Sequence, residues 1–254
     1  MSMLIDSRWI ACVYLLALRL GVLLVMTPIF STLSGLAALR VLFTLSVSLA
    51  VAWGMDIHLP DALQSAGSLF AASLAELALG AAMAFGVFAA FGAFSVAGKI
   101  LDVQSGFGIG SVFDPVTRAG SPLFATMFNM LGVAVFFGMD GHHALLRGIA
   151  FSVQQVPPGA GWQALSPEAA LRQFGLMFSL GIALVAPVMF CLFLVEIGLA
   201  LVSRVLPQMN VFVVGIPVKI VAGVAMLALT VGYLRPVMGG VYASAFNYWE
   251  QVLR

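Results

Sequence analysis

Four charged side chains lie inside long apolar stretches, and they have the clearest capacity for chemistry in this sequence. Arg19 lies at the centre of the first stretch, and Glu76 lies inside the third. Glu196 and Lys219 lie on either side of a break at 207–210. A charge at the centre of a bilayer costs several kcal/mol unless it is paired or hydrated, so each of the four marks a functional or assembly site.

Glu196 and Lys219 are placed so that they can pair. They lie on the two arms of a predicted helical hairpin, one before the break and one after it. At 1.5 Å per residue, their depths along the two arms agree to about one helical turn. An ion pair between them is geometrically possible.

The stretch 104–122 separates two apolar runs and combines glycines with aromatic residues. Its candidate gating residues are Gln104, Gly106, Phe107, Gly108, Ile109, Phe113, Asp114 and Pro115. Glycine permits backbone conformations that other residues avoid, and Asp-Pro favours a turn. Two interpretations stay open here: an ordinary turn between helices, or a re-entrant loop that lines or blocks a path.

The short segment 140–143 contains an aspartate and two adjacent histidines, residue types that could bind a metal. Adjacent residues on a helix point about 100° apart, and no further ligand is spaced nearby. A turn is therefore favoured over a metal site. The third histidine, His58, also falls in a connection, and Cys12 and Cys191 lie in apolar runs where a disulfide or a metal is not expected.

The composition predicts an all-α integral membrane protein. The chain has 254 residues, of which 62% are hydrophobic and 8% charged, whereas soluble domains have about a quarter charged. The apolar runs are continuous, which favours helices over the alternating strands of a barrel. A net charge of +1 without a basic patch argues against nucleic acid as a partner.

The helices that must position these residues are predicted from the apolar runs, some of them short or kinked. The runs cover residues 9–30, 41–53, 69–94, 123–137, 174–202 and 211–234, followed by an aromatic tail over 235–254. The second run is marginal for spanning a bilayer, and the tail predicts either an interfacial belt or a docking helix. We expect one membrane domain, 1–254.

The sequence contains no convincing enzyme motif. The glycines at 106, 108 and 110 have the wrong spacing for a dinucleotide loop, and no lysine follows them as in a phosphate-binding loop. A serine protease within the membrane needs a histidine on a facing helix, and all three histidines fall in connections. We therefore expect no enzyme activity, no catalytic residue, no cofactor and no metal.

The segment 203–219 resembles the signature of the FliR/SctT family, the export-gate subunits of bacterial type III secretion. The matching residues are Arg204, Pro207, Gln208, Asn210, Phe212, Gly215, Pro217 and Lys219. The central loop is also similar, in Gln104, Gly106 to Gly108 and Asp114-Pro115. Further similarity at Pro28, Arg40, Gly141-His142, Ser152 and Pro157 extends the resemblance over nearly the whole chain.

The resemblance implies a non-enzymatic channel subunit for unfolded flagellar or virulence effector proteins. Residues 1–165 would form a FliP-like part whose loop 104–122 plugs the pore, and residues 166–254 a FliQ-like hairpin with the tail. The implied partners are FliP-like and FliQ-like (SctR/SctS-like) subunits, a large FlhB/SctU-type gate protein, exported chains and lipid. These partners could satisfy the buried charges Arg19, Glu76, Glu196 and Lys219.

The resemblance also implies a location in the bacterial inner membrane, within a flagellar basal body or an injectisome base. Gly215 and Gly141-His142 look more flagellar than injectisome-like. One alternative stays open, a secondary transporter that uses the same four buried charges as a substrate or proton site. Helices broken at Pro187 and Pro217 suit that design, but no inverted repeat is visible.

Overall fold

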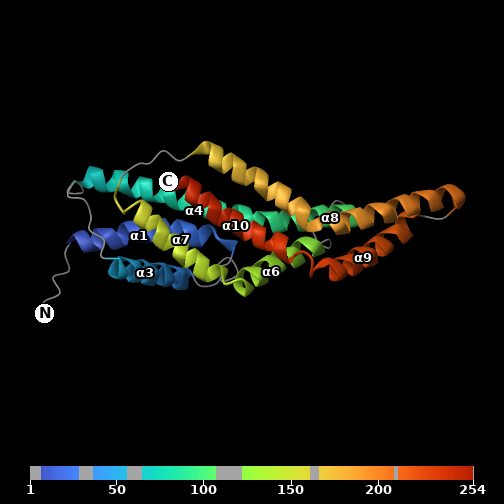
Figure 1. The fold of residues 1–254 in the computed structure, drawn as a ribbon, viewed down its shortest axis with the longest axis horizontal. Coiled ribbons are helices and arrows are strands. Elements are labelled where there is room, and N and C mark those ends of the chain that lie inside the picture. Colours follow the sequence, from blue (N-terminus) through green and yellow to red (C-terminus); the bar gives the residue numbers. More distant parts are fainter. Residues whose placement is uncertain are drawn as a thin grey trace. The chain divides into compact units, whose positions relative to one another are not determined.

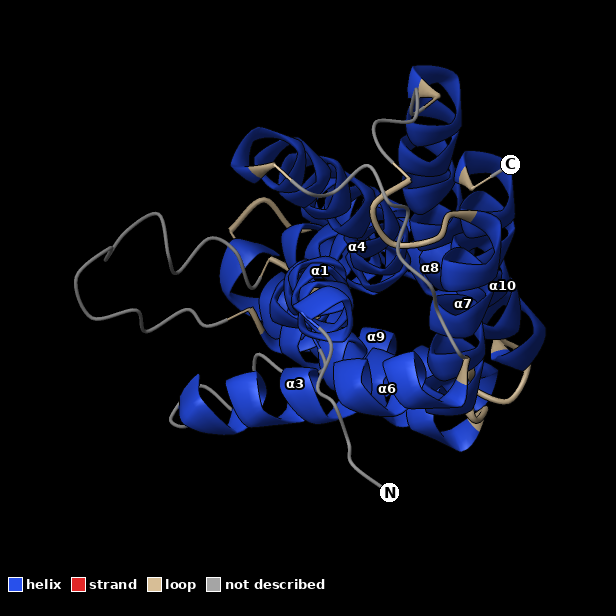
Figure 2. Cartoon of the chain, turned by 90° about the vertical axis from the view of Figure 1, so that its left-hand side faces the viewer, coloured by secondary structure: helices blue, strands red, loops and turns tan. Residues whose placement is uncertain are grey.

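A computed structural model describes residues 7–28, 37–55, 65–106, 122–160, 166–208 and 211–253. Every regular element in these ranges is a helix, and no strand occurs in them (Figures 1 and 2). The helices are α1 (Ser7–Met26), α3 (Ala37–Gly54), α4 (Ala66–Ser105), α6 (Leu123–Gly138), α7 (Gly141–Gln155), α8 (Pro167–Val205), α9 (Val211–Thr230) and α10 (Arg235–Val252). The predicted all-α class is confirmed.

Four of these helices are long and apolar enough to cross a membrane: α1, α4, α8 and α9. A fifth span results if α6 and α7, which a two-residue break separates, are counted together. α3 is apolar but falls below the length of a span, in line with the marginal run predicted there. The membrane class is confirmed by length and composition.

The helix boundaries follow local signals. α1 ends at Met26, just before Pro28. α8 begins at Pro167, where the Ser166 hydroxyl accepts a hydrogen bond from the Ala169 amide at 3.3 Å, as a capping serine does. α4 extends well past the predicted run to Ser105, and Gly106 then adopts a positive φ of 88° that favours glycine.

Contacts divide the chain into two compact units, each discontinuous in sequence. Unit 1 contains Met1–Ala89, Asp140–Phe174 and Ser244–Arg254, and unit 2 contains Ala90–Met139 and Gly175–Ala243. The assignment of 1–165 and 166–254 to a FliP-like and a FliQ-like half stays a prediction.

In unit 1, α3 packs on α1 with its small side chains and turns its large ones outward. Thr44, Ser48 and Ala52 are buried at helical spacing, and the two hydroxyls donate to carbonyls one turn earlier at 2.8 Å. Leu42 and Trp53 are exposed. Small residues at the helix contact and large apolar ones outside are the pattern expected in a membrane environment.

The end of α10 docks into unit 1 through Trp249. The indole Nε1 donates to the Met83 carbonyl at 2.8 Å, and the ring is fully buried. A Cβ atom at Gly148 would collide with this ring, and one at Gly86 would collide with Tyr248 and lie 3.0 Å from Trp249 Nε1. Of the two alternatives for the tail, the structure therefore supports a docking helix.

In unit 2, α10 packs through Tyr242 into an aromatic cluster with Phe91, Phe94 and Phe136. The Tyr242 hydroxyl donates to the Gly132 carbonyl at 2.6 Å. Burial raises the pKa of this phenol far above its usual value, so the group stays a neutral donor.

Candidate functional site

The Arg19 side chain is completely buried in unit 1 and forms a two-pronged ion pair with Glu76. Arg19 Nε donates to Glu76 Oε2 at 2.6 Å, and Nη2 donates to Oε1 at 3.0 Å. This geometry is the strong, orientation-specific form of an arginine–carboxylate contact. It connects the centre of α1 to α4.

The end of α7 completes the coordination of the guanidinium. Arg19 Nη1 donates to the carbonyl and hydroxyl oxygens of Ser152 at 3.2 and 3.3 Å, and Nη2 donates to the Val156 carbonyl at 2.9 Å. Glu76 Oε1 also accepts the amide of Gly159 at 3.1 Å. An arginine has five N–H donors, so all of them have acceptors here.

The chain itself therefore supplies the partners of Arg19 and Glu76. Other subunits are not needed to satisfy this pair, because all the guanidinium donors have acceptors within the chain. A Cβ at Gly80 would lie 2.5 Å from the Arg19 carbonyl oxygen, so the backbones of α1 and α4 are in close contact at this level. We assign this network to holding α1, α4 and α7 together.

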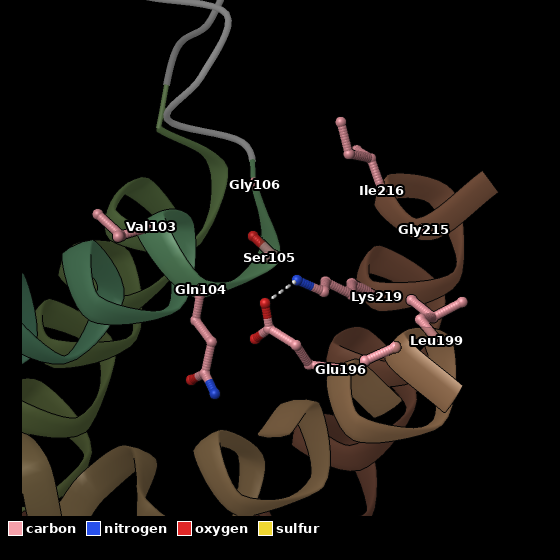
Figure 3. Close-up of a pocket in the computed structure, with 10 residues that line it drawn as sticks. Val103, Gln104, Ser105, Gly106, Glu196, Leu199, Gly215, Ile216 and Lys219 are labelled. Atoms are coloured by element: carbon pink, nitrogen blue, oxygen red, sulfur yellow. Dashed lines mark ion pairs between the residues drawn. The ribbon is translucent and has the colours of Figure 1, made fainter. Parts of the chain in front are cut away.

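The Glu196–Lys219 pair is present in unit 2, as the sequence allowed. Lys219 Nζ lies 3.1 Å from Glu196 Oε1, joining α8 to α9 (Figure 3). The lysine side chain is 16% exposed and the glutamate side chain 56%. The glutamate side chain is thus half-exposed, whereas its lysine partner is mostly buried.

The same pair lines a cavity of about 420 Å³ (Figure 3). Its lining residues are Val103, Gln104, Ser105, Gly106, Glu196, Leu199, Ala200, Gly215, Ile216 and Lys219. Gln104 anchors the end of α4 by donating from Nε2 to the Met189 carbonyl of α8 at 2.8 Å. The walls are mostly apolar, and the polar side chains among them are the ion pair, the Gln104 amide and the Ser105 hydroxyl.

Asp102 holds the two helices that flank residues 107–121. Its two carboxylate oxygens accept the backbone amides of Phe124 and Ala125, each at 2.9 Å, at the start of α6. A carboxylate at a helix amino terminus accepts hydrogen bonds from otherwise unpaired amides, and its negative charge interacts favourably with the helix dipole. The backbones also touch, because a Cβ at Gly98 would lie 2.3 Å from the Ala125 Cα.

Gln104, one of the candidate gating residues, forms a hydrogen bond at the base of this segment, whereas Asp102 was not among the predicted site residues. The hydrogen-bond partners of Asp102 lie 22 and 23 residues later in the chain, so no local sequence pattern indicates them. The other predicted gating residues Phe107, Gly108, Ile109, Phe113, Asp114 and Pro115 lie outside the described residues.

Three residues of the 203–219 signature, Arg204, Pro207 and Gln208, lie at the tip of the hairpin. Arg204 is exposed in the last turn of α8, where a positive charge interacts favourably with the helix dipole. Pro207 and Gln208 are exposed in the turn that follows. Asn210 lies outside the described residues, and Phe212 is described only as backbone in α9.

Comparison with known proteins places the chain in a family. The model of "Bacterial export proteins, family 1" matches residues 10–245. The chain is 30% identical to the flagellar biosynthetic protein FliR of Bacillus subtilis over 243 residues, 94% of this chain and 93% of that protein. It is 25% identical to the Escherichia coli FliR over 189 residues, 73% and 72% of the two chains.

A relative from a different system matches over a shorter stretch. The Yop proteins translocation protein T of Yersinia pestis is 29% identical over 138 residues, 53% of this chain and 52% of that protein. The family match and the relatives agree with the resemblance carried by the segment 203–219. The chain belongs to family 1 of the bacterial export proteins, the FliR and SctT family.

Proposed function

We propose that this chain is a non-enzymatic subunit of a type III protein export gate and forms part of the path by which unfolded proteins cross the inner membrane. The observation that carries the proposal is the family match over residues 10–245. Relatives named for flagellar biosynthesis and for translocation of Yop proteins share that match, which favours a role in export over a secondary transporter.

The exposed surface of the hairpin supports a subunit that works inside an assembly. α8 and α9 expose many large apolar side chains, among them Phe190, Val221 and Leu229. Glu196 on α8 has a half-exposed side chain, and lipid would solvate its carboxylate poorly. We propose that this surface is covered by other membrane subunits, which are FliP-like and FliQ-like proteins and a FlhB-type protein.

The flagellar form of the system is favoured. The Bacillus subtilis FliR matches nearly its full length, whereas the Yop translocation protein T matches about half of its own. The proposed exported chains are therefore flagellar proteins first and virulence effectors second.

The ion pairs give the transporter alternative no support. Arg19 and Glu76 neutralise each other, and so do Glu196 and Lys219. The Arg19 donors are all in use within the chain, so this guanidinium offers no free donor to a substrate.

Co-purification tests the assembly. Expressed with a tag from its own operon, the chain is expected to remain bound in mild detergent to two small polytopic membrane proteins, with one copy of this chain per complex. Native mass spectrometry reads out the partners and the copy number. Recovery of the chain as a lone monomer or homodimer, active in liposomes by itself, would instead establish the transporter.

We further propose that the segment within 104–122 plugs the export path. Phe107, Ile109 and Phe113 supply apolar side chains for a seal, and the glycines allow the segment to move. Support comes from its base, because Asp102 and Gln104 fix the helix ends from which it leaves and to which it returns.

Loss of the aromatic seal should make the assembled gate leaky. Phe107→Ala combined with Phe113→Ala is expected to raise the permeability of cells or proteoliposomes to ions or small solutes well above wild type. A control double variant, Phe70→Ala with Phe88→Ala, removes two exposed phenylalanines of α4 outside this segment and is expected to stay tight. An assembled Phe107/Phe113 variant as tight as the control would refute the plug.

A further inference from the structure

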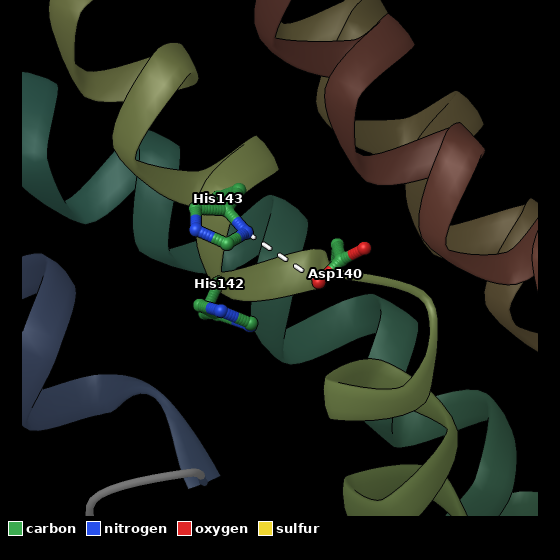
Figure 4. Close-up of side chains that lie close together, drawn as sticks. All are labelled: Asp140, His142 and His143. Atoms are coloured by element: carbon green, nitrogen blue, oxygen red, sulfur yellow. Dashed lines mark ion pairs between the residues drawn. The ribbon is translucent and has the colours of Figure 1, made fainter.

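The turn that leads into α7 brings three side chains with metal-binding atoms together. Potential ligand atoms of Asp140, His142 and His143 all lie within 4.8 Å of one another, and this is the one such group of three in the described ranges (Figure 4). The predicted turn is present at Asp140, but the expectation that the two imidazoles diverge is wrong. Their ring centroids are 4.1 Å apart.

Asp140 has an unusual backbone conformation, and its carboxylate lies beside His143. Asp140 is the only non-glycine residue in the described part of the chain with a positive φ, 55°, and it occupies the position before the first turn of α7. An aspartate there ordinarily caps the helix, yet its side chain makes no capping hydrogen bond. Asp140 Oδ1 lies instead 3.5 Å from His143 Nδ1.

We propose that Asp140, His142 and His143 form a binding site for a divalent transition metal, with Zn²⁺ as the ion it fits best. Two imidazoles and one carboxylate suit zinc, whereas Mg²⁺ and Ca²⁺ prefer oxygen ligands alone. Zinc ligands at about 2.0–2.2 Å in a tetrahedron lie roughly 3.4 Å apart, so the three side chains need to close only modestly. Asp140 and His143 are 77% and 61% exposed and have room to rotate.

Charge makes Asp140 the decisive ligand. The amino terminus of α7 carries partial positive charge, which disfavours a cation, and the carboxylate offsets it. The three side chains leave a fourth tetrahedral position for water or for a ligand from another chain, as in open zinc sites. The inference is independent of the export role, because it depends on these side chains alone.

Calorimetric titration with zinc chloride tests the site. The full-length chain, purified in detergent with a tag that contains no histidine and stripped with a chelator, is expected to bind one zinc ion that millimolar Mg²⁺ does not displace. Asp140→Asn and His143→Ala are each expected to weaken binding by at least about tenfold. His58→Ala removes the remaining histidine of the chain and is the matched control, expected to bind like wild type.

X-ray absorption of the bound zinc gives a second readout that does not depend on variants. It is expected to show nitrogen and oxygen ligands with two imidazoles and no sulfur. The proposal is overturned if the wild-type chain shows no saturable binding, if His143→Ala binds as tightly as wild type, or if His58→Ala abolishes binding. Thermal unfolding without metal confirms that each variant is folded.

Discussion

Replacing Glu76 with glutamine is expected to destabilise the chain by about 3–5 kcal/mol, one of the two largest effects we predict. The substitution keeps the size of the side chain but leaves the buried Arg19 guanidinium without a counter-charge. Breaking a buried ion pair on one side has this magnitude, because the remaining charge stays desolvated. Titration of the purified chain with a denaturing detergent in mixed micelles measures the change in the free energy of unfolding.

Two further variants decide whether charge is the cause. Glu168→Gln makes the same chemical change at an exposed position in the first turn of α8, and we expect it to be neutral within about 0.5 kcal/mol. Arg19→Leu combined with Glu76→Leu removes both charges and is expected to be less harmful than the two single losses added together. Additive losses, or a fully stable Glu76→Gln variant, would mean that the pair does not hold unit 1 together.

The sequence predicts the helices well because each apolar run is a local property. Residues 123–137 and 174–202 were expected to be helical, and α6 and α8 cover them. The ends of the helices are predicted less well. Gln104 was assigned to a loop, but it lies in the last turn of α4. Periodicity and composition do not determine how far a helix continues into polar residues, since those residues gain their partners from elsewhere in the fold.

The same distinction separates the two ion pairs. Glu196 and Lys219 lie on adjacent arms of one hairpin, so the position of the turn alone brings them to the same depth. Arg19 has partners 57, 133 and 137 residues away on α4 and beyond the middle of α7, and no pattern near residue 19 indicates them. Sequence alone could say that this arginine needs a partner but not which chain provides it.

The histidines of α7 illustrate a different limit. The angle of about 100° between neighbouring helical residues applies to their Cα–Cβ directions, whereas rotation about the side-chain bonds can bring long rings together. The close approach of His142 and His143, and the left-handed backbone at Asp140, are visible only in the structure. The Cα–Cβ directions therefore do not determine where the imidazole nitrogens lie.

The second large effect is expected at Gly148, where an added methyl group would collide with the buried indole of Trp249. An alanine Cβ would lie 2.1 Å from Trp249 Cζ3 and 2.4 Å from Cε3. The ring has little freedom to withdraw, because its Nε1 is bonded to the Met83 carbonyl and Gly86 closes the side next to Nε1. Overpacking of this kind costs about 1–3 kcal/mol or more, which exceeds the roughly 0.5–1 kcal/mol that alanine gains over glycine in a helix.

Gly175→Ala is the matched control for Gly148→Ala. Gly175 is also a helical glycine, and nothing lies within 4 Å of its added Cβ, so alanine there should be neutral or stabilising. The same detergent titration compares the two variants, and we expect their effects to have opposite signs. Trp249→Leu should lower the stability by itself but remove most of the further loss caused by Gly148→Ala, since the smaller side chain vacates the contested space. If Gly148→Ala behaves like Gly175→Ala, the end of α10 does not dock against α7 as described, and Trp249 has a role other than packing.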